Sequence, residues 1–227
     1  MRSSFMEEIL TKPSTVESIT QTIAQFFQGG GVFMWIIMIT LAFGLAVALE
    51  RFFKLRSYDT DGPSFMNELQ RNVLSNDIQG AIRVCSNSLA FLPKVLKSGL
   101  KRASHGSEQI QNAIDATALE VIPKVELRLN YLQLVANIST LFGLLGTIQG
   151  LISSFSAVSA ADPSEKAALL SSGIATAMNT TAFGLGVAIL VMILHTFLSS
   201  KAEKIISEID EFSVKLLDLL GAKNKED

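Results

Sequence analysis

The sequence predicts an all-α membrane protein with three transmembrane helices (N-out, C-in), in which the second and third helices extend into a cytoplasmic helical bundle. Composition is the first reason for this prediction. Of the 227 residues, 48% are hydrophobic and only 18% are charged, which is typical of membrane proteins rather than soluble enzymes. Charge placement is the second reason. No Asp, Glu, Lys or Arg lies between Glu17 and Glu50, between Arg128 and Asp162, or between Lys166 and Lys201.

Each uncharged stretch contains a mainly apolar segment that is long enough to cross a bilayer. A helix rises ~1.5 Å per residue, so about 20 residues cross ~30 Å of hydrocarbon. The predicted organisation is a periplasmic amphipathic segment (1–30), transmembrane helix 1 (31–49), a cytoplasmic helical region (50–133), transmembrane helix 2 (134–155), a periplasmic loop (156–170), transmembrane helix 3 (171–198) and a cytoplasmic C-terminal helix (199–227).

The distribution of Lys and Arg sets the predicted orientation. Two of these residues precede the first membrane helix, eleven follow it before the second, one lies between the second and third, and five lie in the tail. Because cytoplasmic loops are enriched in Lys and Arg, this distribution places the N-terminus outside and the C-terminus inside. A cleaved signal peptide is the alternative explanation of the first helix, since Ala46-Val47-Ala48 resembles a cleavage site. The late start of the apolar stretch at Gly31 and the basic residues after it favour a retained helix.

Short helices are expected between the first and second membrane segments. Turn and capping residues predict helices over 64–74, over 77–88 with Ser75 or Asn76 as the cap, and over 92–103. From Ser107 a helical pattern runs without a glycine into the second membrane segment. Only Pro123 interrupts this pattern, which predicts a kink there.

Two amphipathic segments flank the membrane helices. After Pro13 a helical pattern predicts a helix on the outer membrane surface; its apolar positions are Val16, Ile19, Ile23, Phe26 and Phe27. In the tail, apolar residues follow a spacing that alternates between four and three: Ile205, Ile209, Phe212, Leu216 and Leu219. That spacing is typical of a helix that packs against a partner helix, either the extended second helix or a neighbouring subunit.

Polar side chains form stripes on the second and third membrane helices. On the second helix, one ~100° sector of the helix surface contains Asn137, Thr140, Thr147 and Ser154. On the third, one such sector contains Ser172, Thr176, Asn179 and Thr180. Thr147 lies eight residues before Phe155 and Thr181 lies nine after Ser172. Both threonines are therefore expected ~12 to 14 Å below the outer face, level with each other. Unpaired amides are costly in hydrocarbon, so Asn137, Gln149 and Asn179 should face protein or a water-lined space, which favours an oligomer.

Helix packing explains part of the same pattern. Gly146 and Gly150 form a small-xxx-small pair, and Gly143 and Gly184 are also expected at helix contacts. Ser and Thr commonly bond the backbone of their own helix. For any single threonine in these segments, a role in helix packing and a role in ion conduction are therefore equally favoured.

Acidic residues are absent from the membrane segments, and His195 lies near the inner end, where a packing or interfacial role is expected. A proton carrier needs a titratable group, so a partner must supply the carboxylate if the chain conducts ions. Cys85 is the single cysteine, and no spacing indicates a metal site, a cofactor, a phosphate-binding loop or a catalytic triad. We therefore expect neither an enzyme nor a nucleic-acid-binding protein, given a net charge of -2.

Both polar membrane motifs resemble those of the MotA/TolQ/ExbB proton-channel family. FGLLGTIQGLISSF is similar to the second-helix signature GLLGTVxGxIxxF, and GIATAMNTTAFGLGVAIL to the third-helix signature GIxxALxxTAxGLxxAIP. The segment DIQGAIRVCSNSLAFLPKVLKSGL is similar to the small helices of the family. Three membrane helices with a large loop after the first resemble the ExbB/TolQ branch rather than four-helix MotA. Thr176, where many relatives have Glu, and Leu190, where Pro is usual, depart from the pattern.

This resemblance implies a homopentamer in the bacterial inner membrane, enclosing two single-span helices of an ExbD/TolR-like partner whose Asp carries the proton. It implies a stator that converts proton motive force into work on the envelope, such as protein transport through a TonB-like or TolA-like transducer. The residues that it places along the ion path are Thr147 and Thr181, with Thr140, Thr176, Asn179 and Thr180 hydrating or positioning that path.

Two alternatives stay open. The Asn-Thr-Thr run at 179–181 would suit the stator of a surface or gliding motility motor. A non-conducting membrane scaffold would use its small and polar residues only to join helices. The transported ion is open as well, because threonine hydroxyls can serve either H⁺ or Na⁺.

Overall fold

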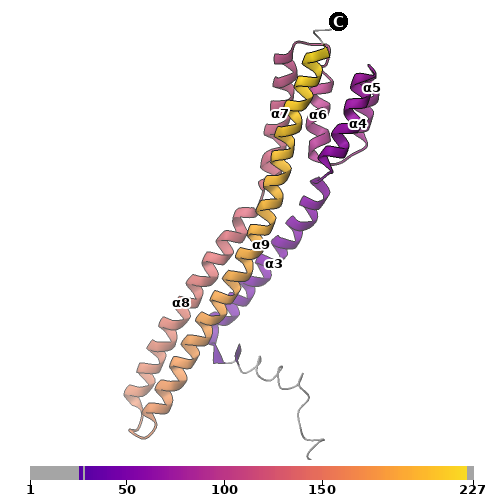
Figure 1. Ribbon diagram of the computed structural model, residues 1–227. Coiled ribbons are helices and arrows are strands. Elements are labelled where there is room, and N and C mark those ends of the chain that lie inside the picture. The colour runs from indigo at the N-terminus through magenta and orange to yellow at the C-terminus, as the bar shows by residue number, and fades with distance from the viewer. Residues whose placement is uncertain (1–25, 28, 224–227) are drawn as a thin grey trace, which may run out of the picture. The chain divides into compact units, whose positions relative to one another are not determined.

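The computed structural model describes residues 26–27 and 29–223. Within these residues the chain is helical and has no strand (Figure 1). The helices are α3 (Gly31–Tyr58), α4 (Gly62–Leu74), α5 (Ile78–Ser86), α6 (Phe91–Leu100), α7 (Ser107–Glu126), α8 (Leu129–Ala160) and α9 (Lys166–Lys223). The amphipathic helix predicted after Pro13 lies almost entirely outside the described residues.

Three of the described helical stretches are long and apolar enough to cross a membrane, which confirms an all-helical membrane protein. They begin at Gly31, Ser107 and Lys166. Helices α3, α8 and α9 contain the three predicted segments and extend beyond them on at least one side. Helix α3, for example, continues nine residues past the expected end at residue 49, to Tyr58.

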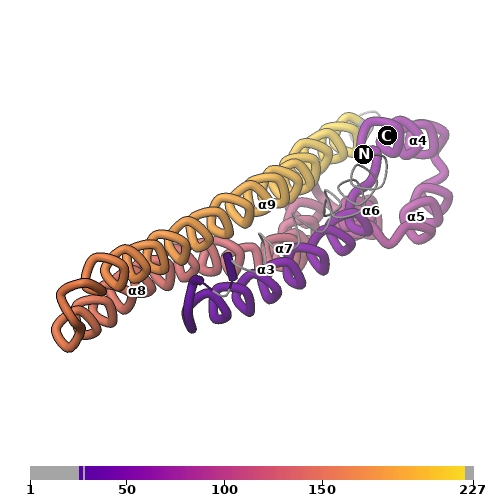
Figure 2. Tube along the Cα trace, turned by 90° about the horizontal axis from the view of Figure 1, so that it is seen from below, coloured from indigo at the N-terminus to yellow at the C-terminus, as the bar shows by residue number. Residues whose placement is uncertain are grey.

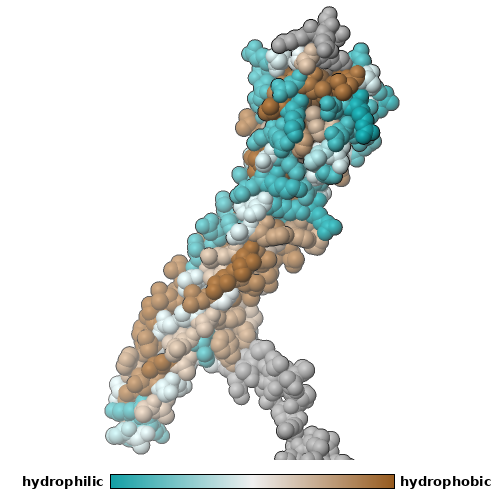
Figure 3. All heavy atoms as spheres, in the orientation of Figure 1, coloured by the Kyte–Doolittle hydropathy of each residue, from teal (hydrophilic) through white to brown (hydrophobic). Residues whose placement is uncertain are grey.

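Two compact units divide the chain. The hairpin unit comprises Leu134–Met192 and the described part of Met1–Gly44, and the bundle unit comprises Leu45–Gln133 and the described part of Ile193–Asp227. On the face that Figure 3 shows, the hairpin unit is mainly hydrophobic, whereas the bundle unit is mainly hydrophilic.

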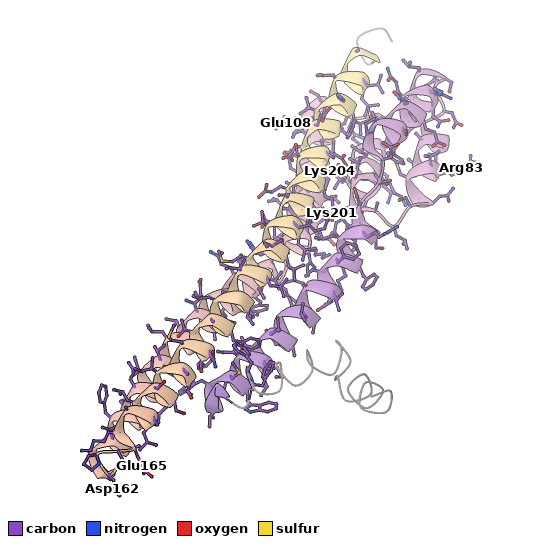
Figure 4. The ribbon with its side chains drawn as sticks, turned by 60° about the horizontal axis from the view of Figure 1, so that its bottom comes forward. Arg83, Glu108, Asp162, Glu165, Lys201 and Lys204 are labelled. Carbon is purple, nitrogen blue, oxygen red and sulfur yellow. The ribbon has the colours of Figure 1, made fainter. Side chains whose placement is uncertain are left out.

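In the hairpin unit, α8 and α9 lie side by side, as both Figure 1 and Figure 2 show. The connection between them is shorter than the predicted loop 156–170, because both helices continue into it and only residues 161–165 lie outside a helix. Asp162 and Glu165 mark this turn in Figure 4. Pro163 accounts for the break, since proline disfavours a helical conformation of the residue before it.

In the bundle unit, the three predicted short helices are confirmed as α4, α5 and α6, which pack in sequence against one another and against α7. The predicted cap of α5 is wrong. Asp77, rather than Ser75 or Asn76, is the N-cap, and its carboxylate accepts a hydrogen bond from the Gly80 amide at 2.7 Å. An aspartate at this position satisfies an amide that the first helical turn leaves unpaired.

The apolar seam of the tail is confirmed over most of its length. Its buried residues are Ile205, Ile209, Phe212, Leu216 and Leu220. Leu220 replaces the predicted Leu219, because a straight helix of 3.6 residues per turn drifts from the 3.5-residue repeat. The partner of Phe212 lies in the same chain: its ring fills the space beside Gly62 of α4, where a Cβ atom would overlap it.

The helical pattern that starts at Ser107 does not run unbroken into the second membrane segment, and its break lies after Pro123 rather than at it. Helix α7 passes through Pro123 and ends at Glu126, and α8 begins at Leu129. The break lies at Leu127, which is extended (φ -49°, ψ 131°), and at Arg128, whose φ is 64°. At this break Arg51 of α3 donates to the carbonyls of Lys124 and Val125, which lie in the last turn of α7, where the helix supplies no amide donors.

Candidate functional site

Small residues form the contact between α8 and α9 in the hairpin unit. A Cβ atom on Gly184 would lie 2.7 Å from the carbonyl oxygen of Ser139 and 2.9 Å from the Cα atom of Gly143. A Cβ atom on Gly150 would lie 3.0 Å from the Cβ atom of Ala177. Since the neighbouring atoms include backbone, these glycines allow an approach that larger residues would prevent.

Gly146 lies directly opposite Thr180, because a Cβ atom there would overlap the threonine side chain. Thr147 and Thr181 are the next residues along each helix, so the two lie within one helical turn of each other in depth. This agrees with the common depth that the sequence predicts for them.

The hydroxyl group of Thr181 crosses between the two helices. It donates a hydrogen bond to the carbonyl oxygen of Gly143 at 2.9 Å. In a regular α-helix the amide of residue i+4 donates to carbonyl i, so the carbonyl of Gly143 is also the acceptor for the amide of Thr147. One carbonyl therefore joins the backbone of Thr147 to the side chain of Thr181.

Thr147 is half-buried, and its hydroxyl donates to the carbonyl of Leu144 at 2.6 Å. Thr140 and Thr176 make the same kind of bond one turn back, each at 3.1 Å, to Ala136 and Ser172. A hydroxyl that donates its single proton to a carbonyl keeps acceptor lone pairs on its oxygen. These threonines can therefore present oxygen atoms to a water molecule or a cation.

Thr180 differs from the other threonines because its side chain is fully buried. Its hydroxyl lies 2.6 Å from the carbonyl oxygen of Gly30 and 2.9 Å from that of Thr176. Asn179 is half-buried, and its amide nitrogen would lie 3.5 Å from a Cβ atom on Gly29. Thr180 thus joins α9 to the residue that precedes α3, and in this chain it is not accessible to solvent.

A groove of ≈ 410 Å³ lies beside these residues within the hairpin unit, lined by the start of α3 and by parts of α8 and α9. Its polar lining is uncharged and includes Gln149, Ser153, Ser172 and Thr176. Five glycines also line the groove: Gly30, Gly31, Gly146, Gly150 and Gly173. The groove offers hydroxyl and amide groups but no carboxylate.

Sequence reasoning missed one serine of this contact, Ser139, and placed a second, Ser154, in the polar stripe without a partner. Ser139 is fully buried, and its hydroxyl donates to the carbonyl of Val135 at 2.8 Å. Gly184 packs against the carbonyl oxygen of Ser139. Ser154 is buried and reaches the carbonyls of Leu169 and Leu170 at 3.3 and 3.4 Å. The signal was present for Ser139, which lies four residues before Gly143 and so continues the small-residue stripe.

Within the described residues, no group of three His, Cys, Asp or Glu side chains could hold a metal ion. His195, which the sequence places near the inner end of the third segment, belongs to the bundle unit. Away from the turn that carries Asp162 and Glu165, the polar groups of the hairpin unit in the described residues are hydroxyls, amides and backbone carbonyls.

Comparison with known proteins agrees with this description. The model of a family described as the MotA/TolQ/ExbB proton channel family matches residues 87–211, more than half of the chain. An ExbB homolog of Methanothermobacter thermautotrophicus, described as a biopolymer transport protein, is 24% identical over 191 residues, which cover 83% of this chain and 67% of that protein.

Proposed function

Because this chain belongs to the MotA/TolQ/ExbB proton channel family, we propose that it is an ion-channel subunit that lines one side of an ion path with Thr147 and Thr181. Family membership supports a proton-channel type of role in energy transduction. The finer proposal is that a second chain supplies the carboxylate that takes up and releases the ion, since the membrane segments here contain none.

The observation that carries the proposal is the pairing of Thr147 and Thr181 in the part of the hairpin that has no charged residue, away from the turn at 161–165. Their hydroxyl oxygens lie at similar depth, and both groups converge on the backbone around Gly143. A path that must bind an ion weakly enough to release it is well served by such neutral oxygen ligands. Thr140, Thr176 and Asn179 would hydrate or position the path, and Thr180 would hold α9 against Gly30.

Exposed polar side chains support an oligomer. Asn137, Thr140 and Gln149 are exposed in the single chain, although they lie in the apolar part of α8. Polar groups in hydrocarbon require partners. We propose that copies of this chain supply them in a homopentamer, which encloses a dimer of an ExbD/TolR-like single-span protein in the bacterial inner membrane, with the N-terminus periplasmic and the C-terminus cytoplasmic.

The test compares Thr147→Val and Thr181→Val with Thr40→Val. Valine keeps the shape of threonine but removes the hydroxyl. Thr40 is a matched control, because it donates to Ile36 O at 2.8 Å within α3, as Thr140 does within α8. We expect both hairpin variants to accumulate and to co-purify with the partner but to lose transport or motor output, whereas Thr40→Val keeps it. Full output from both hairpin variants would overturn the assignment.

A non-conducting scaffold is the second candidate, and one observation favours it. The hydroxyls of Thr140, Thr147, Thr176, Thr180 and Thr181 all lie within hydrogen-bond distance of backbone carbonyls of this same chain, which is what helix packing alone would produce. A scaffold would form stable oligomers without any carboxylate-bearing partner, and its cellular output would not respond to uncouplers. Dependence on both the partner and the proton gradient would exclude it.

The work that such a channel drives is a further proposal. Envelope transport through a TonB-like or TolA-like transducer is the leading candidate, and surface or gliding motility is the alternative. Affinity purification of the complex with its periplasmic partner distinguishes the two candidates, because the protein that the motor acts on should be recovered with it. Replacement of Na⁺ by K⁺ in the flux assay separates a Na⁺ path from an H⁺ path.

A further inference from the structure

The junction between α7 and α8 contains an unusual backbone conformation. Leu127 is extended, and Arg128 has a φ of 64°. Positive φ is uncommon outside glycine, so it persists only where surrounding contacts hold it. Two adjacent residues of α3 supply those contacts, Glu50 and Arg51, and all of these residues belong to the bundle unit.

Arg51 closes the end of α7. Its side chain is fully buried, and Nη2 donates to the carbonyl of Lys124 at 3.2 Å and to the carbonyl of Val125. These carbonyls lie in the last turn of α7, where the helix supplies no amide donors. Burial lowers the pKa of Arg51, but a guanidinium stays charged in proteins, so the carbonyls face a permanent cation.

Glu50 holds the other side of the break. Its carboxylate accepts from Arg128 Nη1 and from Lys54 Nζ, both at 2.6 Å. The hydrogen bond from Lys54, followed by that from Arg128, lowers the pKa of Glu50. The residue with positive φ is therefore held through its own side chain.

We propose that Arg51 is a positioning residue that closes the α7–α8 junction from α3, and that Glu50 fixes the conformation of Arg128, so that the residue preceding α8 is held by α3. Helix α8 carries Thr147, and the effect of the junction on output therefore rests on the proposed function. The basic residues after the first membrane segment predict only an orientation signal. A fully buried Arg51 instead has a structural partner within the chain.

Limited trypsin digestion of the purified complex tests the junction directly, because the bonds after Lys124 and Arg128 are trypsin sites at the break. Arg51→Lys keeps the positive charge but loses the planar fork that reaches two carbonyls. Arg56→Lys is the matched control, since Arg56 is exposed on the same helix. We expect roughly tenfold faster cleavage at the junction in Arg51→Lys, because loss of charged hydrogen bonds raises the open population. Cleavage no faster than in Arg56→Lys would overturn the proposal.

A second pair of variants keeps the test valid if Arg51→Lys fails to fold. Arg128→Gly and Arg128→Ala both lose the contact with Glu50, but only glycine adopts a φ of 64° without a steric penalty. We expect Arg128→Ala to be cleaved after Lys124 faster than Arg128→Gly. Equal rates would show that the positive φ is unimportant and would overturn the part of the proposal that concerns Arg128.

The transport or motor activity of the complex distinguishes a positioning role of Arg51 from a general contribution to stability. We expect Arg51→Lys to lose output at normal accumulation, and Arg128→Gly in the same chain to restore part of it by removing the steric penalty at position 128. Unchanged output in Arg51→Lys despite faster cleavage would overturn the positioning role. If the unsubstituted complex carries no ion flux, the proposed function fails, but the cleavage rates still decide whether Arg51 closes the junction.

Discussion

The two units of the molecule pack their helices in opposite ways. In the hairpin unit the helices meet at glycines, which have no side chain: Gly143, Gly146 and Gly184 pack against small residues and backbone. In the bundle unit it is made by large ones, such as Ile209 and Leu216. The bundle unit also carries ion pairs, including Lys201 and Lys204 of α9, labelled in Figure 4, which lie 3.3 and 3.7 Å from Asp59.

This difference follows from what each surface can bury. Where the surroundings are water, burial of large apolar side chains drives helix packing. In hydrocarbon that driving force is absent, so helix association is stabilised by close backbone approach and interhelical hydrogen bonds. Both units nevertheless place side-chain donors on backbone carbonyls of another helix, as Thr181 does on Gly143 and Arg51 does on Lys124. Loss of volume should therefore harm the bundle unit, and added volume should harm the hairpin unit.

The largest expected effect is a cavity in the bundle unit. Ile209→Ala removes a fully buried side chain from the α9 seam, and such substitutions cost about 2 to 5 kcal/mol of unfolding free energy. Val214→Ala is the control, because Val214 is 58% exposed on the same helix. Thermal denaturation in detergent, followed by helical circular dichroism, should separate the two variants clearly; equal melting temperatures would mean that the seam is not a core.

A smaller effect is expected from one added methyl group in the hairpin unit. Gly184→Ala forces a Cβ atom against the backbone of Ser139 and Gly143, and such overpacking costs about 1 to 3 kcal/mol. In Gly186→Ala the Cβ atom meets nothing within 4 Å, and alanine is the better helix former by ~1 kcal/mol. We expect the first variant to lose accumulation and the second to match or exceed the unsubstituted chain. The reverse order would contradict the glycine contact.

Helices were predictable where local signals determine them. Apolar stretches and turn residues located α3 through α6 to within a few residues, except for the extension of α3 from residue 49 to Tyr58. The break at Leu127 and Arg128 was not predictable from local signals, because the side chain that contacts the end of α7 there is Arg51, more than seventy residues away in the sequence. Pro123 was the obvious local candidate, because an interior proline removes a backbone donor, but α7 continues past it to Glu126.

Acid should have a modest effect, confined to the bundle unit. Hydrogen bonds from Lys124 and Lys94 lower the pKa of Glu120 to about 2. A carboxyl group whose pKa is lowered by folding stabilises the protein above its ordinary pKa, and this contribution is lost as the pH falls toward the folded value. Melting temperatures measured from about pH 6 down to about pH 3 should fall more steeply for the unsubstituted chain than for Glu120→Gln. Parallel curves would mean that these exposed pairs contribute nothing.

The smallest effect concerns Cys85, which is buried in the bundle unit. Burial raises the pKa of its thiol to about 12, so little thiolate forms near neutral pH. We expect slow alkylation by a maleimide in the folded protein and fast alkylation after denaturation. Rapid reaction of the folded protein would show that the surroundings of Cys85 open readily.

The candidate site was predictable in its residues but not in their partners. The spacing of Thr147 and Thr181 gave their common depth, because helix geometry is regular. It could not show that Thr180 is fully buried or that Thr181 bonds to Gly143, because the register of two helices depends on which small residues meet. The residue types therefore indicate a polar path, and the packing determines which hydroxyls can face it.

Ion flux through the chain reconstituted in liposomes with its carboxylate-bearing partner is the most direct test of the central claim. We predict flux under a proton gradient when both proteins are present, no flux from this chain alone, and loss of flux in Thr147→Val and Thr181→Val but not in Thr40→Val. Flux that persists without the partner, or that is unchanged in both hairpin variants, would contradict the claim that these threonines line a path completed by another chain's acid.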